Sequence, residues 1–122
     1  MILADTSIWI DHLRRSDQAL VSLLHRGQVL SHPYILGEVA LGHLRQRKAI
    51  VSDLKNLPQA TVARDDEVLG MIDRWALFGQ GIGYVDAHLL ASIPLSPGTL
   101  LWTRDKRLRA VAVSLGLHAS LK

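Results

Sequence analysis

Short apolar runs alternate with segments of helical periodicity along the chain, and this alternation limits the possible folds more than any other feature. Four runs have the length and composition of strands, residues 2–4, 28–31, 60–63 and 99–103, and residues 117–119 fit a short edge strand. Strands separated by helices pair in parallel, because a parallel connection needs a crossover and the helix supplies it. The sequence therefore predicts an α/β fold with a parallel sheet.

The expected helices are bounded by residues that start or stop a helix. Ser16 or Asp17 can cap a helix that Gly27 ends, and Pro33 fits the first turn of another. The other predicted helices span residues 7–14, 48–56, 66–78, 84–92 and 106–115, and the helix that Pro33 opens runs to about residue 47. Residues 79–83 are rich in glycine but lack the lysine and spacing of a phosphate-binding loop, so a flexible turn is expected there.

Length and composition indicate one domain over residues 1–122. A chain that is 48% hydrophobic has enough apolar residues for a core, and the absence of cysteine removes disulfides, thiolate zinc sites and cysteine nucleophiles. The first residues lack the basic start of a signal peptide, and no apolar run approaches the ~18 residues of a membrane helix. A cytoplasmic protein without membrane attachment is expected.

The charge balance is compatible with a polyanionic partner. There are 14 basic and 11 acidic residues, for a net charge of +3, and ten of the basic residues are arginines. Arginine suits phosphate because its planar guanidinium donates hydrogen bonds in pairs. A mixed, solvated surface would explain the charge equally well.

Two aspartates follow the first and the most clearly apolar of the predicted strands. Asp5 comes directly after residues 2–4, and Asp105 comes shortly after residues 99–103. The carboxyl ends of parallel strands form the edge where ligands bind in open α/β sheets, so the two side chains are neighbours if their strands are adjacent. Each aspartate also precedes a predicted helix, and helix capping explains either of them taken singly.

Two further acids interrupt apolar helical segments. The helical neighbours of Asp86 are Ile82, Gly83, Leu89 and Leu90, and an ionised carboxylate on such a face needs a partner. Glu38 is the one acid between residues 34 and 44, although a glutamate that faces solvent would fit there too. Carboxylates that converge without histidine or cysteine form an all-oxygen site, which favours Mg²⁺ or Mn²⁺ over zinc.

The segments around these acids resemble the PIN-domain family, specifically the VapC-type toxins of toxin–antitoxin pairs. The resemblance lies in residues 2–10, 37–42, 83–91 and 102–108, in this order along nearly the whole chain. It implies a three-layer α/β/α sandwich with a central parallel sheet, and a Mg²⁺- or Mn²⁺-dependent endoribonuclease that hydrolyses RNA with a metal-activated water and leaves 5′-phosphate and 3′-hydroxyl ends. The implied partners are a cognate antitoxin and a second copy of the chain in a homodimer.

Carried over by position, the resemblance implies a role for each acid. Asp5 and Asp86 are the expected direct metal ligands, whereas Glu38 and Asp105 complete the pocket directly or through water. Ser7 and Thr103 match hydroxyl positions that support the site. The basic residues next to Asp105 are candidates for binding the flanking RNA phosphates: Arg104, Lys106, Arg107 and Arg109.

Three other interpretations remain open from the sequence. A histidine-based ribonuclease has six histidines to draw on, but none forms a recognisable pair, and His88 is expected at the surface or in packing. A phospho-receiver domain fits the length and the α/β pattern, yet Asp53 falls in a helical segment rather than at a strand end. A non-catalytic interaction domain would use the same acidic pocket to bind an arginine-bearing partner.

Overall fold

The computed structural model describes residues 1–122 and contains a parallel sheet in the order β2-β1-β3. The strands are short: β1 spans Ile2–Ala4, β2 spans Val29–Leu30 and β3 spans Leu100–Trp102. The helices are α1 Thr6–Arg14, α2 Gln18–His25, α3 Pro33–Leu41, α4 Arg47–Asn56, α5 Asp65–Arg74, α6 Tyr84–Leu95 and α7 Lys106–Ser114. The predicted α/β class and the parallel pairing are confirmed.

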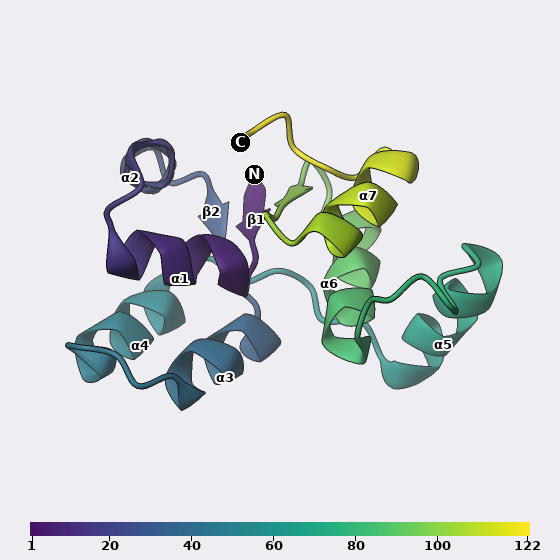
Figure 1. The fold of residues 1–122 in the computed structure, drawn as a ribbon, viewed down its shortest axis with the longest axis horizontal. Helices are drawn as coiled ribbons and strands as arrows, with labels where there is room; N and C mark the ends of the chain where they lie inside the picture. The colour runs from purple at the N-terminus through teal and green to yellow at the C-terminus, as the bar shows by residue number, and fades with distance from the viewer.

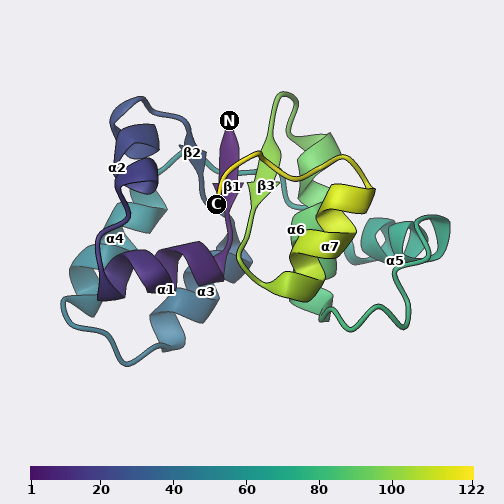
Figure 2. The same cartoon turned by 45° about the horizontal axis from the view of Figure 1, so that its top comes forward.

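The helices lie on both sides of the sheet and form the two outer layers of the fold. Figure 1 shows α1 to α4 on one side of the strands and α5 to α7 on the other. In Figure 2 the three strands lie side by side with the same two groups of helices flanking them. This arrangement is the three-layer sandwich that the sequence resemblance implies.

Single bridges widen the sheet at both edges, where two further strands are expected from the sequence. Ser31 forms a parallel bridge with Gln59, and Leu101 forms one with His118. The expected strand over residues 60–63 is wrong: pairing stops after Ala60, whose backbone N–H donates to the Ser31 carbonyl. The expected edge strand at residues 117–119 is likewise reduced to one bridge. Short central strands leave little length for longer partners to pair with.

Three helices end at other places than the sequence predicts. The α3 helix ends at Leu41 rather than near residue 47, because the chain leaves the helical conformation at Gly42. The α5 helix ends at Arg74 instead of residue 78, since Ala76 adopts a φ of +51° and the following Leu77 turns into the core. Conversely, α6 continues to Leu95 with Pro94 in its last turn, where the missing N–H removes only one helical hydrogen bond.

The hydrophobic core lies between the sheet and both helix layers. Its largest fully buried members include Trp102, Leu3, Ile8, Leu20, Ile35, Leu90 and Leu108. In α6, residues 87–93 are all buried, so this helix is enclosed on every side. Burying that much apolar surface is the main stabilising contribution in a domain of this size.

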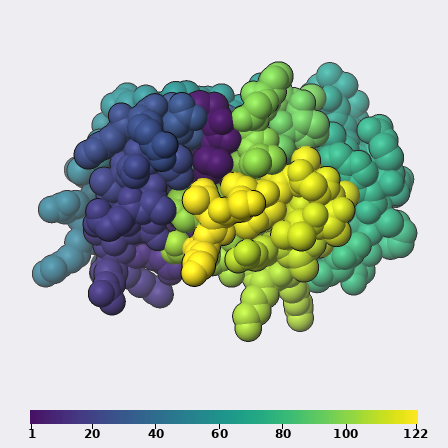
Figure 3. Space-filling model, turned by 90° about the horizontal axis from the view of Figure 1, so that it is seen from above, coloured from purple at the N-terminus to yellow at the C-terminus, as the bar shows by residue number.

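The two ends of the chain lie close together, beside the N-terminal strand. The Met1 amino group donates to the Gly98 carbonyl, and Arg104 Nε donates to the Lys122 carbonyl. In Figure 3 the yellow C-terminal segment lies next to the purple and blue N-terminal helices. No helix has both the length and the apolar character required to span a bilayer.

Candidate active site

The carboxyl ends of β1 and β3 place Asp5 and Thr103 next to each other. The two strands pair in parallel, with Ala4 opposite Trp102, so the residues that follow them leave the same edge of the sheet. The Thr103 hydroxyl donates to Asp5 Oδ2 at 2.6 Å. This edge is the one where open α/β sheets bind ligands, as the sequence suggests.

Asp5 is buried and held by donors on both carboxylate oxygens. Its Oδ1 accepts from the backbone N–H groups of Ser7 and Ile8 and from the Ser7 hydroxyl, so the side chain also caps α1. Burial raises the pKa of Asp5 above its ordinary value of 3.8, and the hydrogen bonds from Ser7 and Thr103 oppose that rise. The capping interpretation of Asp5 is confirmed, and capping leaves its carboxylate at the edge of the sheet where the predicted site lies.

Asp86 lies in the first turn of α6 and is half-buried. Its Oδ2 accepts the Gly83 backbone N–H at 3.1 Å, which fixes the side chain near the helix N-terminus. The pKa of Asp86 is raised above 3.8, first by burial and then by the negative charges of Asp105, Asp5 and Glu38. The four acids that the sequence singles out thus lie near enough to repel one another.

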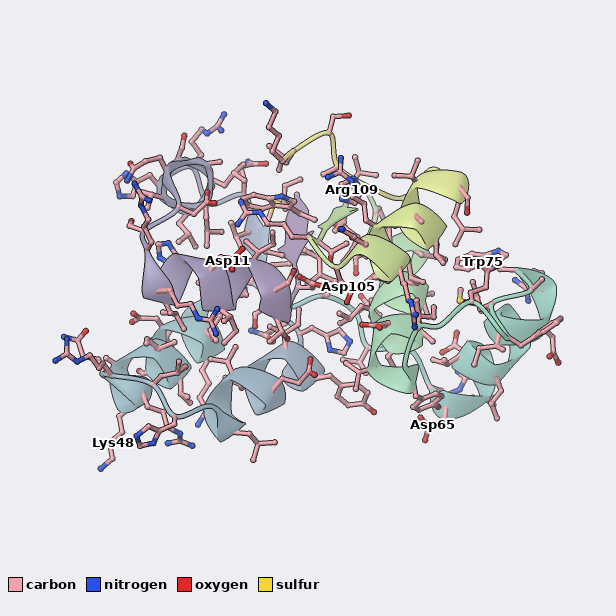
Figure 4. All side chains as sticks on the ribbon, viewed as in Figure 1. Asp11, Lys48, Asp65, Trp75, Asp105 and Arg109 are labelled. Carbon is pink, nitrogen blue, oxygen red and sulfur yellow. The ribbon has the colours of Figure 1, made fainter.

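Glu38 and Asp105 complete the acidic group from α3 and from the start of α7. Glu38 Oε1 accepts the Thr6 hydroxyl at 2.8 Å, and Asp105 Oδ1 accepts the Leu108 backbone N–H at 2.9 Å. Thr6 was not predicted from the sequence, although its place between Asp5 and Ser7 is a signal that could have found it. Figure 4 shows Asp105 near the centre of the molecule, between α1 and α6.

One pocket of about 170 Å³ collects all four carboxylates. It is lined by Asp5, Thr6, Ser7, Glu38, Asp86, Leu89 and Asp105. Glu38, Asp86 and Asp105 each use one oxygen to accept a protein hydrogen bond and leave the other without a protein donor. The pocket therefore presents carboxylates whose remaining lone pairs are available to a cation.

The chemistry of this donor set fits a hard divalent cation. Every titratable group that lines the pocket is a carboxylate, and oxygen-only ligands favour Mg²⁺ or Mn²⁺. After burial, the negative charges of Asp105, Asp5 and Glu38 also raise the pKa of Asp86, and a cation would offset this repulsion. In the structure itself, no three acidic or histidine side chains are close enough around one point to hold an ion. The side chains would have to move to close the ligand set.

Arg104, one of the predicted RNA contacts, makes several contacts within the protein and does not line the pocket. Its guanidinium pairs with Asp11 and Asp17, donates to the Lys122 carbonyl and lies 5.3 Å from the centre of the Trp102 ring. These contacts use its donors to join α1, the start of α2 and the C-terminal segment.

The other three basic residues near Asp105 are exposed. Lys106 has no ion-pair partner, whereas the Arg107 side chain lies against Gly81, where an added Cβ would come within 2.8 Å of Arg107 Cδ. Gly81 also has a φ of +77°, so both the backbone and the space favour glycine there. Arg109 lies one turn further along α7, where its backbone N–H donates to the Asp105 carbonyl at 2.8 Å.

The residues on which the alternative interpretations depend lie outside the pocket. No histidine lines it. His88 is buried rather than at the surface, and it packs against Tyr34 and Tyr84. Asp53 lies on α4, exposed and away from the strand ends. Neither a histidine-based site nor a receiver-type aspartate is assembled.

Sequence comparison agrees with this geometry. The PIN domain matches residues 2–114, which is most of the chain, and the protein therefore belongs to the PIN-domain family. It is also similar to Ribonuclease VapC32 from two strains of Mycobacterium tuberculosis, CDC 1551 / Oshkosh and ATCC 25618 / H37Rv. Each is 48% identical to it over 117 residues, covering 96% of this chain and 94% of the relative.

Proposed function

We propose that this protein is a metal-dependent endoribonuclease and the toxin of a toxin–antitoxin pair. The observation that carries the proposal is the single pocket in which Asp5, Glu38, Asp86 and Asp105 meet from four separate segments. The family membership and the similarity to a ribonuclease support RNA as the substrate. An RNA substrate also fits action in the cytoplasm.

Asp5 and Asp86 are the proposed direct ligands of Mg²⁺ or Mn²⁺, with Glu38 and Asp105 binding directly or through water. The bound cation would lower the pKa of a water molecule and neutralise charge that develops on the phosphate. Thr103 and Ser7 hold Asp5 in place, and Thr6 holds Glu38. Such supporting hydroxyls orient the carboxylates.

Phosphodiester hydrolysis at this site would proceed without the RNA 2′-hydroxyl and leave 5′-phosphate and 3′-hydroxyl ends. We assign contacts with the flanking phosphates to Lys106 and Arg107, because they follow Asp105 directly and are exposed. Arg109, one turn after Asp105 on α7 and also exposed, is proposed to contact a phosphate further along the RNA.

Two protein partners are proposed, a cognate antitoxin and a second copy of the chain. The support for a homodimer is the exposed apolar end of α3, where the Leu41 side chain is 89% accessible. An open groove of about 520 Å³ adjoins it, lined by Pro33, Tyr34, Gly37, Glu38, Ala40, Leu41, Arg47 and Val85. Light scattering should give twice the chain mass of 13.5 kDa, and a monomer mass would contradict the dimer.

The function is tested by RNA cleavage with the wild type and with Asp5→Asn. Asparagine can still cap α1, so the variant should fold while losing the anionic ligand. Wild-type protein with Mg²⁺ or Mn²⁺ should cut RNA at defined sites and leave 5′-phosphate ends, and EDTA should stop the reaction. Expression of the wild type should arrest growth, and the variant should not.

Other results would contradict the proposal in recognisable ways. Cleavage that EDTA leaves unchanged would point to a metal-independent ribonuclease. Equal cleavage by the wild type and Asp5→Asn would remove the carboxylate pocket from the chemistry. An absence of cleavage by the isolated chain with either cation would leave a pocket that only binds a basic partner.

A further inference from the structure

A second pocket lies across the first turn of α6 from the carboxylate pocket. This aromatic pocket has a volume of about 190 Å³, and its walls include Ile72, Phe78, Gly79, Ile82, Gly83 and Tyr84. One wall residue, Gly83, also contacts the candidate active site, because its backbone N–H donates to Asp86 Oδ2 at 3.1 Å. The aromatic pocket therefore adjoins the turn that holds Asp86.

Two exposed aromatic side chains line this pocket. The Phe78 side chain is 68% accessible, and that of Tyr84 is 46% accessible. The Tyr84 hydroxyl donates to Asp65 and its ring packs against His88, whereas Phe78 belongs to none of the ring pairs within the protein. Single exposed apolar side chains are common on protein surfaces, but this one lines a pocket beside a group of carboxylates. Phe78 is therefore the ring available for stacking.

The rim of the aromatic pocket carries a guanidinium and free backbone donors. Arg107 crosses Gly81 so closely that an added Cβ there would lie 2.9 Å from Arg107 Nη1. Arg107 forms no ion pair, and the backbone N–H groups of residues 78–82 donate to no backbone carbonyl. In Figure 1 the segment that contains these residues runs from α5 to the start of α6, close to the start of α7. The rim therefore suits a phosphate, next to a pocket that suits a ring.

We propose that the aromatic pocket binds one unpaired base of the RNA, stacked on Phe78, while Arg107 binds the phosphate that leads toward the carboxylates. Stacking on aromatic side chains is a common way in which proteins bind single-stranded RNA. The volume lies below the ~300–1,000 Å³ of pockets for drug-sized ligands, so one ring system fits and a larger group does not. The choice of RNA as the occupant rests on the proposed function.

The position of the pocket determines which base it binds. Tyr84 faces the aromatic pocket and Asp86 faces the carboxylate pocket, so the width of α6 separates the two sites. A helix with its side chains is about 10 Å wide. The bound base therefore belongs to a nucleotide that flanks the cleaved bond, and it must have no pairing partner.

The pocket is tested first by NMR of the Phe78 ring, which selective labelling isolates because Phe78 is the only phenylalanine of the chain. A single-stranded adenylate RNA octamer, added in EDTA to prevent cleavage, should move the ring protons upfield and give cross-peaks to base protons. Inorganic polyphosphate has the charge without the bases and should leave these protons unmoved. RNA that binds without moving them, or polyphosphate that moves them equally, would overturn the proposal.

Two substitutions of Phe78 then separate stacking from apolar contact. Phe78→Leu keeps an apolar side chain but removes the ring, so the Kd of the adenylate octamer and the KM for RNA cleavage should each rise about tenfold, with kcat changed less than about threefold. Phe78→Tyr keeps a ring and should restore most of the affinity. The matched control is Leu69→Ala, at a leucine on α5 that is 58% accessible and outside the pocket, which should bind RNA as the wild type does.

The other outcomes distinguish this pocket from the proposed function. Equal RNA affinity in the wild type and Phe78→Leu, or equal losses in Phe78→Leu and Phe78→Tyr, would overturn stacking on Phe78. A Phe78→Leu protein that changes from dimer to monomer with unchanged RNA affinity would assign the pocket to a second copy of the chain instead. Wild-type protein that shows the Phe78 shift without cleaving RNA would contradict the proposed function and leave the base pocket standing.

Discussion

Asp86→Asn is expected to slow RNA cleavage about a hundredfold to a thousandfold and, at the same time, to stabilise the metal-free protein. Activity falls because the neutral amide is a poor ligand for Mg²⁺. Stability rises because burial and the charges of Asp105, Asp5 and Glu38 raise the pKa of Asp86, so its ionised form is disfavoured in the folded state. Ionised Asp86 therefore lowers the free energy of unfolding. This loss grows as the pH rises from 3.8, the ordinary pKa of the carboxyl group, through its higher pKa in the folded protein.

Denaturant unfolding in EDTA at several pH values measures this effect. The difference in unfolding free energy between Asp86→Asn and wild type should be smallest in acid and grow as the pH rises through that window. Asp73→Asn is the matched control, because Asp73 is an exposed aspartate on α5 without a side-chain partner. A variant that is less stable than wild type at neutral pH, or that cleaves RNA normally, would contradict the account.

Thr103→Val is expected to give the next largest effect, on both stability and catalysis. The Thr103 hydroxyl is fully buried, donates to Asp5 Oδ2 and accepts the Asp105 backbone N–H at 3.1 Å. Valine has the same shape but leaves both groups unpaired, which should cost about 1–3 kcal/mol of unfolding free energy. Cleavage should slow roughly tenfold, because such supporting hydrogen bonds orient the carboxylate.

Thr99→Val is a close control for this substitution. Thr99 precedes β3 as Thr103 follows it, and its buried hydroxyl has no hydrogen-bond partner, so valine there should be neutral or stabilising. Because the Thr103 hydrogen bond lowers the pKa of Asp5, the acid limb of the pH–rate profile should also move to higher pH in Thr103→Val. Equal effects of the two substitutions would show that Thr103 contributes only packing.

Much of the fold could be predicted because the signals are local. Gly27 ends α2 with a φ of +65°, and Asp17 caps its start through the Leu20 N–H. The wrong boundaries depend on contacts that are distant in sequence or on turns without a glycine. Ala76 adopts positive φ because the buried Leu77 must reach the core, and nothing in the local sequence indicates it.

The site could also be predicted in outline, because the sequence shows which acids follow strands. Asp5 and Asp105 follow strands, and strand order alone brings them to one edge. The role of Arg104 could not be predicted, because it depends on Asp11, Asp17 and the chain end meeting in space.

The central claim is that the four carboxylates act as one cation site, and Mn²⁺ binding measured by electron paramagnetic resonance tests it most directly. Wild-type protein without RNA should bind Mn²⁺ and release it to excess Mg²⁺. Asp86→Asn should bind at least about tenfold more weakly, while Asp73→Asn should bind as the wild type does. Equal Mn²⁺ affinity in the wild type and Asp86→Asn would contradict the claim.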